Sequence, residues 1–138
     1  MATKRPLVNV AGEVKELPSG DTLTIDGTPL DVMGFYPGLP TASAILTRVP
    51  IARAVVFPAS LAGSYGKASA NATAQTDFDV QKNGSSFGTM RFAAAASTAT
   101  FISASGSTFA AGDVLSVVAP ATPDATLANV GFAITGTR

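Results

Sequence analysis

The turn sequence Asn83-Gly84 lies between two stretches of alternating apolar residues, and it restricts the fold of this 138-residue chain more than any other feature. Both residues accept the positive φ that tight hairpin turns demand, so this pair between alternating stretches is a strong hairpin signal. The pattern therefore predicts two antiparallel strands joined by a tight turn within residues 78–92.

Two registers of this hairpin place different side chains in the core. A two-residue loop would set Val80 opposite Phe87, whereas a three-residue loop over residues 82–84, with a glycine bulge, sets Val80 opposite Ser86. The second register is preferred because it gathers large apolar side chains on one face, and burial of one face normally fixes the register. That face consists of Phe78, Val80, Met90 and Phe92.

The preferred register leaves Phe87 on the outer face of the hairpin, beside Asp79. An exposed aromatic residue there is either an ordinary surface residue or part of a contact between subunits. Phe87 is therefore a candidate interface residue.

The remainder of residues 47–138 is predicted to be rich in short strands. Apolar and β-favouring residues form brief runs between turn signals, and no amphipathic stretch longer than about ten residues has a helical period. The expected strands, besides the hairpin, cover residues 49–57, 65–73, 97–102, 114–118 and 129–135. This pattern predicts an all-β domain over residues 47–138, folded as a compact antiparallel β-sandwich of the jelly-roll kind.

Residues 1–46 differ from the rest of the chain in their sequence pattern. They are expected to form an extended N-terminal arm for attachment or oligomerisation. A short hairpin is expected over residues 21–30, with its turn at Asp26-Gly27. The block at residues 35–40 cannot lie in a central strand because two of its residues are prolines. Its aromatic residues, Phe35 and Tyr36, are further candidate interface residues.

Composition excludes several classes of chemistry. The chain has no cysteine and no histidine, which removes disulfides, cysteine nucleophiles, the usual zinc sites and the Ser-His-Asp triad. Nine basic residues balance nine acidic ones, so electrostatic capture of nucleic acid is not expected. No apolar run is long enough for membrane insertion or a secretory signal. Charged residues make up only 13% of the chain, which favours a surface partly covered by neighbouring subunits.

Arg53 is the charged residue that most needs an explanation, because it lies within the apolar segment 49–57. A buried arginine needs a carboxylate or several carbonyl groups, which a subunit contact would supply. The alternative is an edge position with the guanidinium in water, and the sequence does not choose between the two.

The acidic residues do not form a recognisable site. Asp77 and Asp79 share one face of a strand, as a pair of catalytic carboxylates would, but with no second acidic cluster they are interpreted as solvated. Asp113 and Asp124 are interpreted as turn residues that bond to their own backbone. No catalytic, metal-ligating or cofactor-binding residue is therefore assigned, and an enzyme is not expected.

Two blocks of the chain resemble tailed-bacteriophage virion proteins. Residues 12–23, GEVKELPSGDTL, are similar to a segment of tail-fibre and tail-tip proteins. Residues 78–92, 109–115 and 119–128 look like a β-rich module at the C-terminal ends of such proteins. The resemblance implies a non-enzymatic virion component, commonly a homotrimer, made in the bacterial cytoplasm. It implies an N-terminal segment that docks or intertwines and no catalytic residue.

The sequence therefore leaves three hypotheses. The first is a tail-fibre or tail-tip subunit that acts by protein–protein assembly at host attachment. The second is a capsid decoration protein, because many tail fibres have a shaft and this chain has no repeat that forms one. The third is a carbohydrate-binding module that recognises a glycan or receptor on the host surface.

Overall fold

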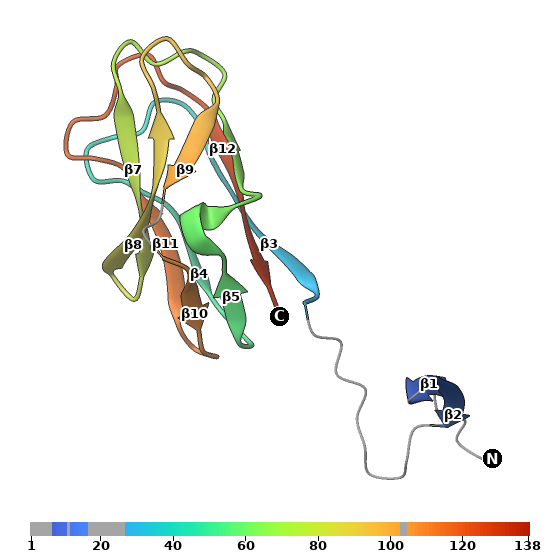
Figure 1. Cartoon of the computed structure of the whole chain (residues 1–138). Coiled ribbons are helices and arrows are strands. Elements are labelled where there is room, and N and C mark those ends of the chain that lie inside the picture. The colour runs from blue at the N-terminus through green and yellow to red at the C-terminus, as the bar shows by residue number, and fades with distance from the viewer. Residues whose placement is uncertain (1–6, 11, 17–26, 103–104) are drawn as a thin grey trace.

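The computed structural model describes residues 7–10, 12–16, 27–102 and 105–138, and within them it is an antiparallel β-sandwich preceded by a separate hairpin (Figure 1). The hairpin contains β1 (Leu7–Val10) and β2 (Glu13–Glu16). The first sheet has the order β10 (Ser107–Phe109), β5 (Val55–Phe57), β12 (Val130–Thr137), β3 (Pro29–Tyr36), with β6 (Tyr65–Lys67) also paired to β12. The second sheet has the order β4 (Ile45–Pro50), β11 (Val114–Val118), β7 (Thr76–Lys82), β8 (Ser85–Phe92), β9 (Ala99–Ile102). The all-β sandwich predicted from the sequence is confirmed.

The core lies between the inner faces of the two sheets. Strict alternation along β7 and β12 buries every second side chain, as expected for strands with one face toward a core. The largest fully buried side chains come from both sheets and the 3-10 turn Ala59–Leu61. They include Phe57, Phe78, Phe92, Phe109, Leu61, Met90, Leu115 and Ile134.

The register predicted for the central hairpin is wrong, although the inner face that it predicted is correct. The turn has two residues, Asn83 and Gly84, both with positive φ, and Lys82 pairs with Ser85. A bulge then shifts the register so that Val80 pairs with Gly88, leaving Phe87 without a partner on β7. The bulge restores the predicted inner face, and Phe78, Val80, Met90 and Phe92 are all fully buried.

Phe87 consequently lies toward the core side and not on the outer face. It is half-buried, and its ring is 5.3 Å from that of Phe109 and 6.1 Å from that of Phe57, measured between centroids. Both partners are fully buried in the same chain. The packing of Phe87 is therefore explained within its own subunit.

The turn of this hairpin is bonded to the neighbouring turn before β11. The Asn83 Nδ2 donates to Asp113 Oδ1 at 2.8 Å, and the Val114 amide donates to Asn83 Oδ1 at 2.8 Å. The second oxygen of Asp113 accepts from the Ala110 amide at 2.8 Å and lies 3.1 Å from Lys82 Nζ. Asp113 thus joins two turns, in addition to bonding its own loop as predicted.

Protonation of Asp113 is expected to weaken this link between turns. Hydrogen bonds from Asn83, then Ala110 and Lys82, lower the pKa of Asp113 to about 2. A carboxyl group with a lowered folded-state pKa stabilises the fold above its unfolded value of about 4 and loses that effect as the pH falls toward about 2. The difference in unfolding free energy between wild type and Asp113→Asn should therefore shrink from pH 5 to pH 2 in urea titrations. A difference that stays constant over this range would contradict the assignment.

The segment 49–57 does not form a single strand. β4 ends at Pro50 in the second sheet, and β5 begins at Val55 in the first sheet, so the chain crosses between sheets over residues 51–54. Ile51 remains buried in the crossing, where its backbone bonds to Asp113 and Gly112. An apolar run continues through such a crossing because both sheets face the same core, and this is why the sequence did not indicate the break.

The N-terminal arm is shorter than predicted. β3 pairs with β12 along its whole length, from Pro29 opposite Thr137 to Tyr36 opposite Val130, and the boundary predicted after residue 46 falls inside β4. The sandwich therefore includes the chain from Gly27 onward. The hairpin expected over residues 21–30 lies partly outside the described residues, and Pro29 and Leu30 belong to β3.

Two smaller expectations also need revision. The predicted strand over residues 65–73 is limited to β6, and the link over residues 105–112 contains β10, paired with β5. Residues 93–96 form no strand or helix, as expected. The strands expected at 97–102 and 129–135 are present as β9 and β12, and that at 114–118 is β11.

Candidate functional site

The outer faces of the two sheets differ in chemistry. On the second sheet, Asp77 accepts two hydrogen bonds from Arg91, at 2.7 and 2.8 Å, and Asp79 accepts one from Gln81 at 2.7 Å. These contacts partner the charged groups at the centre of the sheet, whereas Ile45 and Ile102, 53% and 43% exposed, lie on the same outer face in its two edge strands. Asp77 and Asp79 therefore serve as surface residues, as predicted.

The outer face of the first sheet carries an apolar group of side chains on β3, β6 and β12, with Asp31 and Lys67 on the same face beside it. Met33 and Phe35 are 74% and 62% exposed, and Tyr65 of β6 is 58% exposed. The pairing of Met33 and Tyr65 with Ala133, and of Phe35 with Gly131, puts all five on one face of the sheet. We call these residues, Met33, Phe35, Tyr65, Gly131 and Ala133, the apolar face.

Phe35 and Tyr36, although adjacent in sequence, point to opposite sides of β3. Phe35 belongs to the apolar face, and its ring lies over Gly131, where a Cβ atom would stand 3.6 Å from Phe35 Cδ2. Tyr36 is partly buried against the core. The sequence pattern did not single out Met33, although its place two residues before Phe35 is a signal for the same face. Tyr65 carries no such signal, because only tertiary pairing brings it there.

Arg53 lies in the crossing between β4 and β5 and is exposed in the isolated subunit, so any burial of its guanidinium would come from a second chain. It lines a groove of about 460 Å³ between β3 and β4, which are edge strands of opposite sheets on the same side of the sandwich. On the other side, a bridge between Lys67 and Thr98 connects β6 to the chain just before β9. β3 and β4 are not hydrogen-bonded to each other, and the groove lies between them.

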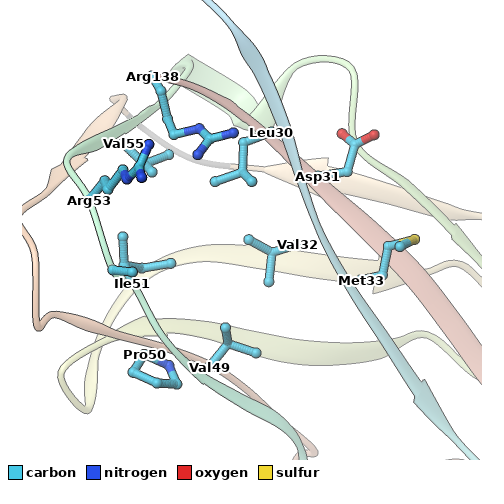
Figure 2. A pocket seen from close by; sticks show the side chains of 11 residues that line it. Leu30, Asp31, Val32, Met33, Val49, Pro50, Ile51, Arg53, Val55 and Arg138 are labelled. Atoms are coloured by element: carbon cyan, nitrogen blue, oxygen red, sulfur yellow. The ribbon is translucent and has the colours of Figure 1, made fainter.

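The groove has apolar walls and two cations at one end (Figure 2). Leu30 and Val32 of β3 face Ile51 across it, whereas Asp31 and Met33 point away. The side chains of Arg53 and Arg138 lie near the same end, and neither forms an ion pair with a residue of the described chain. Such an arrangement suits an apolar ligand that carries a carboxylate.

Asp124 is the most heavily bonded carboxyl group among the described residues, and its role is structural. One oxygen accepts from the hydroxyl and amide of Thr73 and from the Ala74 amide, and the other from the hydroxyl and amide of Thr126 and from the Leu127 amide. Burial opposes ionisation of this carboxyl, but the hydrogen bonds outweigh burial and hold its pKa well below the ordinary range. With every acceptor position used, Asp124 is not free for chemistry.

Within the parts of the chain that the structure describes, three or more acidic residues nowhere gather as a metal site would require. A search of the same residues finds no helix long and apolar enough to span a membrane. The features with no role in the fold itself are the apolar face and the groove.

Comparison of the chain with protein-family models, curated proteins and solved structures finds no significant match. The site must therefore be interpreted from its own geometry and from the resemblance of the sequence blocks described above.

Proposed function

We propose that this protein is a non-enzymatic structural subunit of a tailed-bacteriophage virion, acting at the tail fibre or tail tip by protein–protein assembly. The observation that carries the proposal is the apolar face, with Met33, Phe35 and Tyr65 exposed on a regular sheet. A contiguous exposed apolar surface on a β-sandwich is typical of an interaction site. Its aromatic and methionine side chains are the kinds enriched in protein interfaces.

The charged centre of the other sheet supports this choice of surface. The ion pair between Asp77 and Arg91 and the bond between Gln81 and Asp79 give the second sheet partners of its own. A neighbouring virion protein would bury apolar area on the first sheet, where Asp31 and Lys67 are the charged groups on the same face. Assembly through the first sheet leaves the second sheet facing solvent or the host.

Replacement of Met33 and Phe35 together by serine should remove the protein from particles without unfolding it. Both side chains point away from the core, so the melting temperature should change by no more than about 3 °C. Immunoblots of purified particles should show at least a tenfold loss of the subunit, as expected when two central interface side chains are truncated. The control is Val56→Ser, a 48% exposed residue of the first sheet outside the apolar face, which should enter particles normally. Normal incorporation of the double variant would contradict the proposed face.

Antibody labelling of intact particles tests the location. Label at the tail tip or fibre supports the proposal, and label on the head alone replaces it with the capsid decoration alternative, whose assembly could use the same apolar face.

A carbohydrate-binding module at the host surface is the third candidate. It is less favoured because the chain has no tryptophan, and a flat glycan-array response would remove it.

A further inference from the structure

The hairpin formed by β1 and β2 lacks a core of its own. Leu7 and Val14 are 66% and 68% exposed, and all residues of β2 are exposed. The two strands pair with each other and with no strand of either sheet among the described residues. A single two-stranded hairpin is only marginally stable in water, so a surface that covers one of its faces would stabilise it.

One face of this hairpin combines apolar side chains with a carboxylate. Leu7 pairs with Glu16 and Asn9 pairs with Val14, so all four side chains lie on the same face. On the opposite face, Glu13 forms an ion pair with Lys15 at 2.6 Å, whereas Glu16 has no such partner in the described chain. Val8, opposite Lys15, lies on the face of that ion pair, and Leu7, Val14 and Glu16 lie on the face without one.

The groove between β3 and β4 has the complementary chemistry. Its walls are apolar, with Leu30, Val32 and Ile51 facing one another, and Arg53 and Arg138 carry positive charge at one end. Its two flanking strands are sheet edges, which natural proteins usually cover. We propose that the hairpin of one copy binds in this groove of a second copy. Leu7 and Val14 pack on the apolar walls, and the Glu16 carboxylate lies at Arg53 and Arg138.

The length of the chain allows this exchange. Ten residues separate Glu16 from Gly27, and ten extended residues span at most about 35 Å. The Gly27 amide donates to the Arg138 carbonyl at 2.8 Å, so the connecting segment starts at the arginine end of the groove. A hairpin in the groove of the next copy is a head-to-tail contact, and a closed ring of such contacts pairs every hairpin with one groove. The inference specifies the subunit contact within the proposed structural function.

Disulfide cross-linking tests the contact in the full-length chain, whose lack of cysteine removes background reactions. Val14→Cys is introduced in one preparation and Ala52→Cys, at the groove, in another. Mixing the two under mild oxidation should give a linked species of two chains, far more abundant than with either variant alone. A matched control pairs Val14→Cys with Thr100→Cys, an exposed residue of the second sheet, and should not be linked. Linkage that occurs only within a chain bearing both cysteines would overturn the exchange between copies.

Charge exchange gives a second readout. Glu16→Lys should weaken self-association about tenfold or more, because it places a cation against two arginines. The matched variant Glu13→Lys, on the other face of the hairpin, should change it less than about threefold. Combining Glu16→Lys with Arg53→Glu and Arg138→Glu should restore most of the loss. Light scattering of the purified protein measures the self-association of each variant. Circular dichroism verifies that the variants are folded.

The outcomes separate this inference from the proposed function. A wild-type chain that is monomeric at micromolar concentration overturns the exchange, as does an oligomer that Glu16→Lys leaves intact. Either result leaves the virion assignment to the particle-labelling experiment. Cross-linking of the expected pair in a protein that never enters particles would support the hairpin exchange and contradict the proposed function.

Discussion

Asp124→Ala is expected to lower the free energy of unfolding by about 3 kcal/mol, because six hydrogen-bond donors, among them the buried Leu127 amide, lose a charged acceptor. The carboxylate joins the loop at Thr73 and Ala74 to the loop at Thr126 and Leu127. Leu127 is 1% exposed, so the second loop covers part of the core. Urea titration at pH 7 measures the loss, and for a domain of this size the melting temperature should fall by about 10 °C.

The control for this prediction is Asp77→Ala, which removes a carboxylate of the same kind from the protein surface. Its ion pair with Arg91 is about one-third exposed on both sides, and such pairs contribute roughly 0–1 kcal/mol. If both variants lose the same stability, Asp124 does not hold the loops together. The stabilisation by Asp124 is complete at pH 7, because its lowered pKa keeps it ionised there, and it declines only below about pH 4.

Gly34→Ala is the second substitution expected to have a large effect, with a loss of about 2–3 kcal/mol. Gly34 pairs with Phe132 across β3 and β12, and a Cβ atom at position 34 would overlap the Phe132 ring. Phe132 is only 6% exposed, so its ring has little freedom to move away. Thermal and urea unfolding of the variant should show the loss with no change in sheet content.

Gly131→Ala provides a matched control on the neighbouring strand. Its new methyl group would point to the outer face, where the nearest side-chain atom, Phe35 Cδ2, lies at an ordinary contact distance of 3.6 Å. Stability should change by less than about 0.5 kcal/mol. Equal effects of the two substitutions would mean that backbone preference, and not overlap with Phe132, limits position 34.

The strands that the sequence predicted best are those with a strict alternation of apolar and polar residues. Val130, Phe132 and Ile134 identify the buried face of β12. The segment 114–118 also matches β11 residue by residue, although it is an apolar run without alternation. Short strands such as β10 escaped detection, because three residues are too few to show a period. The predicted N-terminal arm was too long, because β3 belongs to the sandwich through its pairing with β12. That pairing joins residues about one hundred positions apart, which a local pattern does not show.

The candidate site was predicted only in fragments. Phe35 was identified as an interface residue and is exposed, but Tyr36 and Phe87 pack toward the core. Arg53 was singled out as a charge that needed explanation, and its explanation requires Arg138, from the other end of the described chain. No local pattern links these two arginines, since they lie 85 positions apart in the chain.

By itself the sequence determined the turn at Asn83-Gly84, the strand-rich character of the chain and the side chains that the central hairpin buries. These are local properties, fixed by the φ angles that each residue accepts and by the two-residue period of a strand. Only the tertiary structure decided the bulge at Phe87, the crossing between β4 and β5, and the groove lined by Arg53 and Arg138. Each of these depends on contacts with residues distant in the chain, and the packing of two sheets around one core selects among registers that the local sequence leaves close in energy.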